Sequence, residues 1–194
     1  MAGCMSPSEA SAQVHREFGG RTAGCNPAHR SPPLAMLASL ADDNLPACAV
    51  AEARLTHHDA LAGDVAAAVT VLCRSLICGA AWECAVQRSA EERQAETSAA
   101  TFSDRDGPGT SGGFAPEVLR AAMYFVGSSS SFSEALGRSV EFAGPANYCP
   151  VLVGAIGGAR WGSSAIPASA LADVDILRRV EACTHGLAAG WAKA

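Results

Sequence analysis

Three polar segments of this 194-residue chain, each directly ahead of a predicted helix, hold the side chains best suited to chemistry. The first, residues 22–34, contains Gly24, Asn26 and Arg30 at a proline-containing turn. Backbone N–H groups at a turn before a helix can bind an anion, and the planar guanidinium of arginine pairs well with phosphate. A proline-rich turn with a surface arginine explains the same residues, and for this segment alone it is the simpler interpretation.

The second segment, residues 55–64, contains the adjacent histidines His57 and His58 behind Thr56. Neighbouring residues on a helix point in different directions, so these two imidazoles cannot ligate one ion from one face. Thr56 or Asp59 can instead cap the helix that follows. The segment therefore predicts a capped helix start, with the histidines as candidate ligand contacts.

The third segment, residues 144–149, leads into an apolar run of small residues. Asn147, Tyr148 and Cys149 can each hydrogen-bond a ligand, but a helix start also needs polar caps. The segment holds no pair of carboxylates and no nucleophile beside a base. Residue types and spacing thus indicate a helical domain with a cluster of polar loops, and no particular reaction.

The stretches between these loops carry apolar residues at helical spacing. Apolar residues make up 49% of the chain and aromatic residues 6%, so the core must be built from Ala, Leu and Val, which favours closely packed helices. No alternating strand pattern of useful length is visible. We predict an all-α, compact bundle of about six to nine helices. The predicted helices begin at Pro33 and continue over 45–55, 60–79, 82–96, 114–126, 128–144, 149–162 and 166–192, with 1–32 and 101–113 irregular. Ser131 or Ser133 can cap the helix within 128–144.

Charge and cysteine pattern exclude several classes of protein. The net charge is −5 and the basic residues are scattered, so no basic stripe for nucleic acid is present. None of the eight cysteines has the C-x2-C spacing of a zinc knuckle. The first twenty residues contain no apolar leader, and no uninterrupted apolar stretch has the length of a membrane span. We therefore expect a cytoplasmic protein with reduced thiols, without nucleic-acid or membrane partners.

Taken together and in order, the polar segments resemble those of the ADP-ribosylglycohydrolase family. Its pattern G-N-G-x-x-M-R-x-x-P-L is similar to residues 24–34, with matches at Gly24, Arg30, Pro33 and Leu34. The family then has an L-T-H leading into an alanine-rich helix, which residues 55–57 resemble.

Three later segments continue the resemblance, which covers about residues 19–175. Gly113 and Phe114 resemble the family's glycine-aromatic helix start, and residues 131–136 its serine-phenylalanine-E-A-L helix. Residues 153–162 and 166–167 are similar to the small-residue helix and the I-P that end the family pattern. No single motif is decisive, but five in the same order make coincidence an unsatisfactory explanation.

The resemblance implies an all-α bundle with a two-magnesium centre that cleaves the glycosidic bond between ADP-ribose and an acceptor. Its partner is then ADP-ribose or an ADP-ribosylated protein. The catalytic positions carried over are Asn147 and Tyr148, with Asn147 also the candidate Mg²⁺ ligand. The ADP-ribose-binding positions are Gly24, Asn26, Arg30, Thr56 and His57.

Two departures from the family pattern concern the metal. An ungapped comparison sets Pro145, Asn147 and Tyr148 where the family's G-G-D-x-D-T has Asp, Asp and Thr. The family's T-D-D metal segment has no counterpart, because the residues before Gly24 contain no aspartate. Mg²⁺ prefers hard, anionic oxygen ligands, so we expect this chain to bind magnesium poorly.

Three functional alternatives follow. The chain is a hydrolase of the family, a catalytically inactive ADP-ribose-binding or structural module, or a fragment of a longer hydrolase. We expect residues 21–194 to form the C-terminal part of the family domain behind a disordered tail, 1–20. An incomplete bundle would expose apolar helix faces and tend to self-associate.

Overall fold

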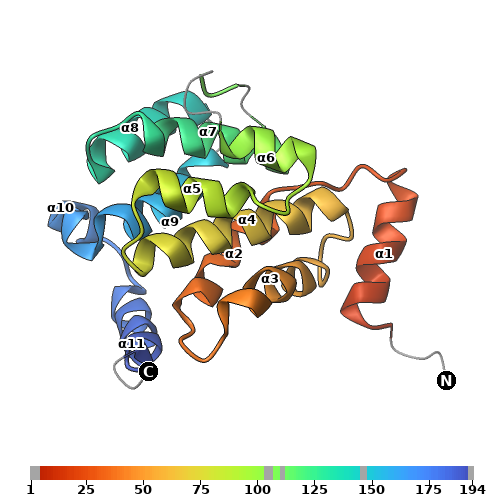
Figure 1. Cartoon of the computed structure of the whole chain (residues 1–194), viewed down its shortest axis with the longest axis horizontal. Helices are drawn as coiled ribbons and strands as arrows, with labels where there is room; N and C mark the ends of the chain where they lie inside the picture. Colours follow the sequence, from red (N-terminus) through yellow and green to blue (C-terminus); the bar gives the residue numbers. More distant parts are fainter. Residues whose placement is uncertain (1–4, 103–106, 110–111, 145–147, 192–194) are drawn as a thin grey trace.

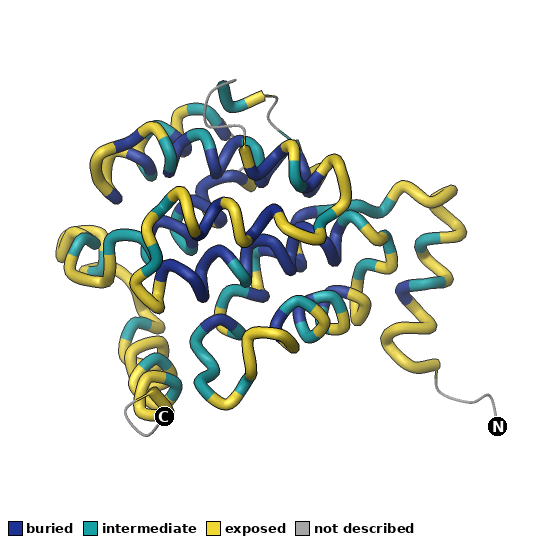
Figure 2. Tube along the Cα trace, in the orientation of Figure 1, coloured by how far each residue is buried: buried dark blue, intermediate teal, exposed yellow. Residues whose placement is uncertain are grey.

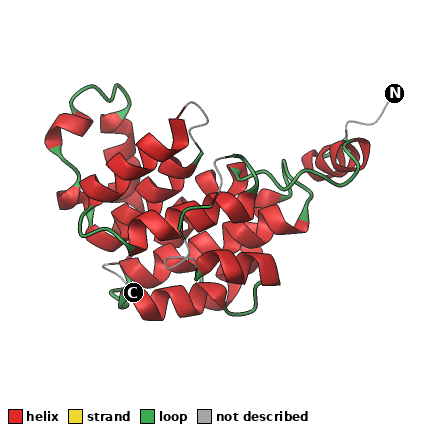
Figure 3. Cartoon of the chain, turned by 90° about the horizontal axis from the view of Figure 1, so that it is seen from above, coloured by secondary structure: helices red, strands yellow, loops and turns green. Residues whose placement is uncertain are grey.

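The computed structural model describes residues 5–102, 107–109, 112–144 and 148–191. Within these ranges the chain folds into eleven α-helices joined by short 3₁₀ turns and loops, and no strand is present (Figure 3). The predicted all-α architecture is confirmed, although the number of helices exceeds the six to nine expected.

Helix α4 (Ala60–Ile77) is the centre of the bundle. It packs against α3 (Leu45–Ala53), α5 (Trp82–Ala90), α7 (Ala115–Gly127) and α9 (Cys149–Trp161), as Figure 1 shows. Among the described residues, only α4 is long and apolar enough to cross a membrane, yet 72% of it is buried inside the protein. A buried core helix meets the same length and hydropathy criteria, and that is what α4 is here.

The remaining helices surround this centre. Helix α8 packs on α9 and α7, and α6 packs on α7 and α5. The terminal helices contribute least to the core, since α1 buries a single residue and α11 buries none (Figure 2). The bounds are α1 Pro7–Glu17, α2 Asn26–Arg30, α6 Ala95–Thr101, α8 Phe132–Ala143, α10 Ala168–Leu171 and α11 Leu177–Ala188.

The core confirms the expectation from composition. Alanines fill the helix contacts, and the larger fully buried side chains come mostly from α4, α7 and α9. Small side chains let helix axes approach closely, which is why a chain with few aromatic residues still closes its interior. These larger side chains include Val65, Val69, Leu72, Leu119, Met123, Leu152 and Ile156.

Two predicted helix caps are present. The Asp59 carboxylate accepts a hydrogen bond from the Leu61 backbone N–H at 3.0 Å, which fixes the start of α4. The Ser131 hydroxyl accepts one from the Glu134 N–H at 3.2 Å at the start of α8. Both helices begin where the sequence predicts.

Two predicted segments need correction. Residues 1–32 were expected to be irregular but contain α1 and α2. The helix expected from Pro33 is a 3₁₀ turn, Pro32–Met36, because the buried Arg74 guanidinium donates hydrogen bonds to the carbonyl oxygens of Ala35, Leu37 and Leu40. Those carbonyls are thereby held out of an α-helical ladder.

The prediction of one helix over 82–96 is also wrong, because this segment contains α5 and the start of α6. The segment is interrupted between α5 and α6, where Glu92 has a positive φ of 58°. A non-glycine residue in that conformation cannot continue a right-handed helix. The division of the chain into a tail, 1–20, and a domain, 21–194, stays a prediction.

Candidate functional site

A cavity of about 770 Å³ lies between α1 and the rest of the bundle. Its volume falls within the range of small-molecule binding sites. We call its two sides the α1 wall and the body wall. The α1 wall consists of Val14, Phe18, Gly20 and Arg21, and the body wall of Thr22, Ala23, Gly24, Thr56, His57, Asp59, Leu61, Gly113 and Phe114.

Backbone pairing brings distant segments of the body wall together. The Cys25 N–H donates to the Gly113 carbonyl at 3.0 Å, and the Ala115 N–H donates to the Ala23 carbonyl at 2.8 Å. Gly24 therefore lies opposite Phe114 in an isolated antiparallel bridge. Segments about 90 residues apart in the sequence thus share one edge of the cavity, because main-chain hydrogen bonds hold them.

Gly24 permits a close approach of His57 to this edge. A Cβ atom at position 24 would lie 2.9 Å from the His57 Nε2 and 3.2 Å from its Cδ2. No side chain larger than hydrogen fits there unless the imidazole moves. Glycine is therefore required at position 24 by the proximity of the ring, and not by an unusual backbone angle.

A short hydrogen-bond chain fixes Thr56 and His57. The Arg30 Nη2 donates to the Thr56 Oγ1 at 2.7 Å, and that oxygen is 2.9 Å from the His57 Nδ1. Arg30 also forms an ion pair with Glu52. Burial, followed by the charge of Arg30, lowers the pKa of His57, so the imidazole is neutral near neutral pH.

The predicted ADP-ribose-binding residues divide into two groups. Gly24, Thr56 and His57 line the cavity. Arg30 does not line it, and its guanidinium supports Thr56 from behind while paired with Glu52. Asn26 is exposed at the start of α2, also outside the lining. Their assignment to ADP-ribose stays a prediction.

Of the two predicted catalytic positions, the structure describes one. Tyr148 immediately precedes α9, and its ring carbon Cζ is 3.5 Å from where a Cβ on Gly113 would be. Its ring stacks on His29 with centroids 6.4 Å apart and planes 27° apart. Asn147 lies outside the described residues, so its roles as catalytic group and Mg²⁺ ligand stay predictions.

Several cavity residues were missed from sequence. Val14, Phe18 and Arg21 belong to a segment expected to be irregular, and Phe18 is 63% exposed in spite of its aromatic ring. The amphipathic pattern of α1 and the serine–glutamate capping box at its start were the available signals, with Ser6 accepting from the Glu9 N–H. His29 lies in the first polar segment but outside the cavity lining, and the sequence predicted no role for it.

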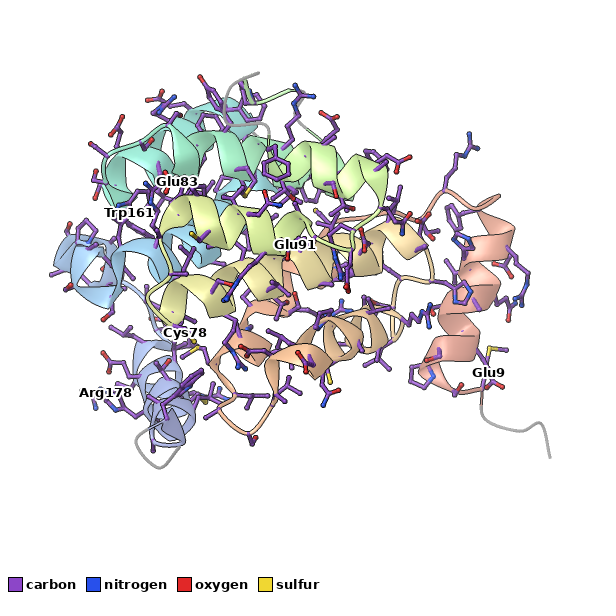
Figure 4. All side chains as sticks on the ribbon, in the orientation of Figure 1. Glu9, Cys78, Glu83, Glu91, Trp161 and Arg178 are labelled. Carbon is purple, nitrogen blue, oxygen red and sulfur yellow. The ribbon has the colours of Figure 1, made fainter. Side chains whose placement is uncertain are left out.

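A second, charged groove of about 590 Å³ lies on another face, beside the turn between α5 and α6. Its acidic side includes Glu91, which is labelled in Figure 4. Arg74 lies in its wall but is already satisfied by three carbonyl oxygens and by Asp42, 2.6 Å away. This groove contains none of the predicted site residues.

The comparison with family models agrees with this geometry. The model described as ADP-ribosylglycohydrolase matches residues 2–193. The chain belongs to the ADP-ribosylglycohydrolase family. The match spans nearly the whole sequence, including all three polar segments singled out above, so the cavity is formed by segments of the family domain.

A solved structure described as "ADP-ribosylglycohydrolase-related protein complex" has the same fold, with a TM-score of 0.81. The match covers 95% of this chain and 68% of that one at 22% sequence identity, so the likeness concerns the fold. No significant match was found among curated proteins.

The family is generally metal-dependent, but the described side chains do not fit a magnesium centre. Within residues 5–102, 107–109, 112–144 and 148–191, no group of three His, Cys, Asp or Glu side chains could hold a metal ion. Among the described residues, the donors at the start of α9 are the Tyr148 phenol and the Cys149 thiol, with the His29 imidazole stacked on Tyr148. Burial raises the pKa of that thiol to about 12, so it stays neutral. None of these is the anionic oxygen that Mg²⁺ prefers.

Proposed function

We propose that this protein binds ADP-ribose, free or attached to a protein, in the cavity between α1 and the body wall, without the metal-dependent hydrolysis typical of its family. One observation carries the proposal. The family-like segments around Gly24, Thr56–His57 and Gly113–Phe114 meet at a single cavity of about 770 Å³, while the start of α9 lacks acidic ligands among its described residues.

The chemistry of the walls suits a nucleotide-like ligand. Phe18 and Phe114 are 63% and 47% exposed and line the same cavity, so each offers a ring face to a nucleobase. Arg21 is the one arginine of the lining and is exposed, so it can pair with a diphosphate. The neutral His57 and the Thr56 hydroxyl supply hydrogen bonds for the ribose hydroxyls.

The hydrolase is the second candidate, and family membership favours it. A reaction needs a group that activates water or protonates the leaving atom. Neither wall contains a carboxylate pair, because Asp59 is the single acid of the lining and its side chain caps α4. We therefore place binding ahead of turnover as the function of this chain.

Calorimetric titration with ADP-ribose in EDTA tests the proposal. We expect one site with the same affinity when MgCl₂ replaces EDTA, and no release of ADP-ribose from an ADP-ribosylated peptide in either buffer. AMP should bind more weakly than ADP-ribose, because it lacks the second phosphate and the second ribose. Binding confined to the magnesium buffer, or hydrolysis there, would establish the hydrolase instead.

Location and assembly are further proposals. The seven described cysteines are all free thiols, which supports a reducing, cytoplasmic location. Ile176 and Val180 near and on α11 are 56% and 48% exposed, which supports self-association through that helix. Arg178, labelled on the same helix in Figure 4, is exposed beside them.

A further inference from the structure

His29 and Tyr148 are far apart in the sequence, and their side chains are in contact in the folded protein. His29 is on α2 and Tyr148 immediately precedes α9, and these helices pack against each other. The two rings are stacked with centroids 6.4 Å apart, within the range of favourable aromatic contacts. The planes of the two rings are 27° apart.

The hydrogen bonding and protonation state of His29 are consistent with a packing role for its ring. Its Nε2 atom is buried and has no hydrogen-bond partner within the protein. Burial lowers the pKa of His29, so the ring is neutral and behaves as a flat, mainly apolar surface beneath Tyr148. A buried polar atom without a partner costs free energy. Nε2 therefore adds no polar contact within the protein, and the contact of the ring with Tyr148 is one of packing.

Tyr148 in turn reaches the body wall. Its Cζ lies 3.5 Å from the place of a Cβ on Gly113, which is ordinary van der Waals contact. Gly113 lines the cavity and accepts the Cys25 N–H that holds the body wall together. The phenol ring is 38% exposed, and its contacts with His29 on α2 and with the Gly113 segment lie at the corner where the described donors do not fit magnesium.

We propose that the His29–Tyr148 pair holds this corner of the bundle together in place of a metal ion. In a metal-dependent site, a dication bound by several segments fixes their relative positions. Here two aromatic rings from α2 and the start of α9 do so, and the body wall keeps its shape without any ion. The inference rests on the proposed function only in that the corner borders the cavity proposed for ADP-ribose.

A double-mutant cycle on the full chain tests the pair. The variants H29M and Y148T carry the residue types of the family pattern, and thermal unfolding is measured for each single variant and for the double variant in EDTA. We expect each single substitution to lower Tm by about 3–6 °C, and the double variant to lose clearly less than the sum. H185M, on the exposed face of α11, is the matched control and should leave Tm unchanged.

A metal comparison completes the experiment. The Tm of the unmodified chain should be the same in EDTA and in about 5 mM MgCl₂. An ion that binds only the folded chain would raise Tm in MgCl₂. Additive single effects, or a higher Tm in MgCl₂, would overturn the inference whether or not ADP-ribose binds. Conversely, a coupled pair in a chain that binds no ADP-ribose would refute the proposed function and leave the inference standing.

Discussion

The body wall of the cavity is fixed by main-chain hydrogen bonds and buried neighbours, whereas the α1 wall rests on the bundle through a few side chains. The Ser11 hydroxyl donates to the Arg54 carbonyl at 2.6 Å, and the His15 Nδ1 is 2.6 Å from the Thr22 Oγ1. The His15 ring also contacts the His58 ring, with centroids 5.5 Å apart. Ser11 is the single buried residue of α1.

The two walls of the cavity therefore differ in rigidity and in what they can contribute to ligand binding. The body wall presents Gly24, Thr56 and His57 in positions set by the fold, as recognition of a particular ligand requires. Gly19 and Gly20, which follow α1, have φ angles of 60° and 77° that suit glycine, and Phe18 of the α1 wall is mostly in solvent. Substitutions on the two walls should therefore act differently on binding and on stability.

The largest effect is expected from Gly24→Ala on the body wall. The new methyl group would lie 2.9 Å from the His57 Nε2, and the imidazole must turn away from the cavity edge. We expect ADP-ribose affinity to fall about tenfold, equivalent to about 1.4 kcal/mol. The change in Tm should be small, since the displaced atom is the end of a side chain. Gly112→Ala, where a Cβ meets nothing within 4 Å, is the control for calorimetry.

A smaller loss of binding is expected from Phe18→Ala on the α1 wall. The ring is 63% exposed, so its removal leaves the free energy of unfolding nearly unchanged. Losing one face of base stacking should weaken ADP-ribose binding by about 1 kcal/mol, or roughly fivefold. Phe102→Ala provides the comparison, since that ring is 46% exposed but outside the cavity. Equal affinities for both variants would remove Phe18 from the site.

Ser11→Ala should act on stability more than on binding. It removes the hydroxyl that attaches α1 to Arg54, with an expected cost of about 1 kcal/mol in unfolding free energy. Hydrogen exchange should quicken in α1 while α4 stays protected, because the attachment is local. Ser8→Ala, on the exposed side of the same helix, should change neither quantity. Equal loss of hydrogen-exchange protection in α1 and α4 would show that the attachment of α1 is not local.

The pH dependence of stability is the smallest expected effect. Burial lowers the pKa values of His29 and His57 below the ordinary 6.5, so the unfolded chain binds more protons than the folded one between the lowered values and 6.5. The stability contributed by these residues is complete above about pH 6.5 and is lost as the pH falls below it. In urea unfolding at pH 7 and pH 5, H29M should lose less stability on acidification than the unmodified chain, while H185Q should behave like the latter.

The helical fold could be predicted because its signals are local. The helical spacing of apolar residues over 60–79 and the caps Asp59 and Ser131 depend on residues a few positions apart, and these predictions are confirmed. The 3₁₀ turn Pro32–Met36 could not be predicted, because Arg74, some 40 residues further on, takes its carbonyls. α1 was missed because proline, serine and histidine obscure its short amphipathic pattern.

The site was predictable in part, through the resemblance. Gly24, Thr56 and His57 were singled out and line one cavity. The pairing of residues 23–25 with 113–115, which brings them together with Phe114, depends on backbone bonds that no residue pattern indicates. The contact between His29 and Tyr148 arises from the packing of α2 on α9, and only the folded chain reveals it.

Crystals soaked with ADP-ribose in EDTA test the central claim, metal-independent binding between the two walls, most directly. We predict ligand density in the cavity beside Gly24, His57 and Phe114, with Tyr148 still stacked on His29 and no ion at the start of α9. Density in the charged groove beside Glu91, or ligand that enters the cavity only with a divalent ion bound next to Tyr148, would contradict the account.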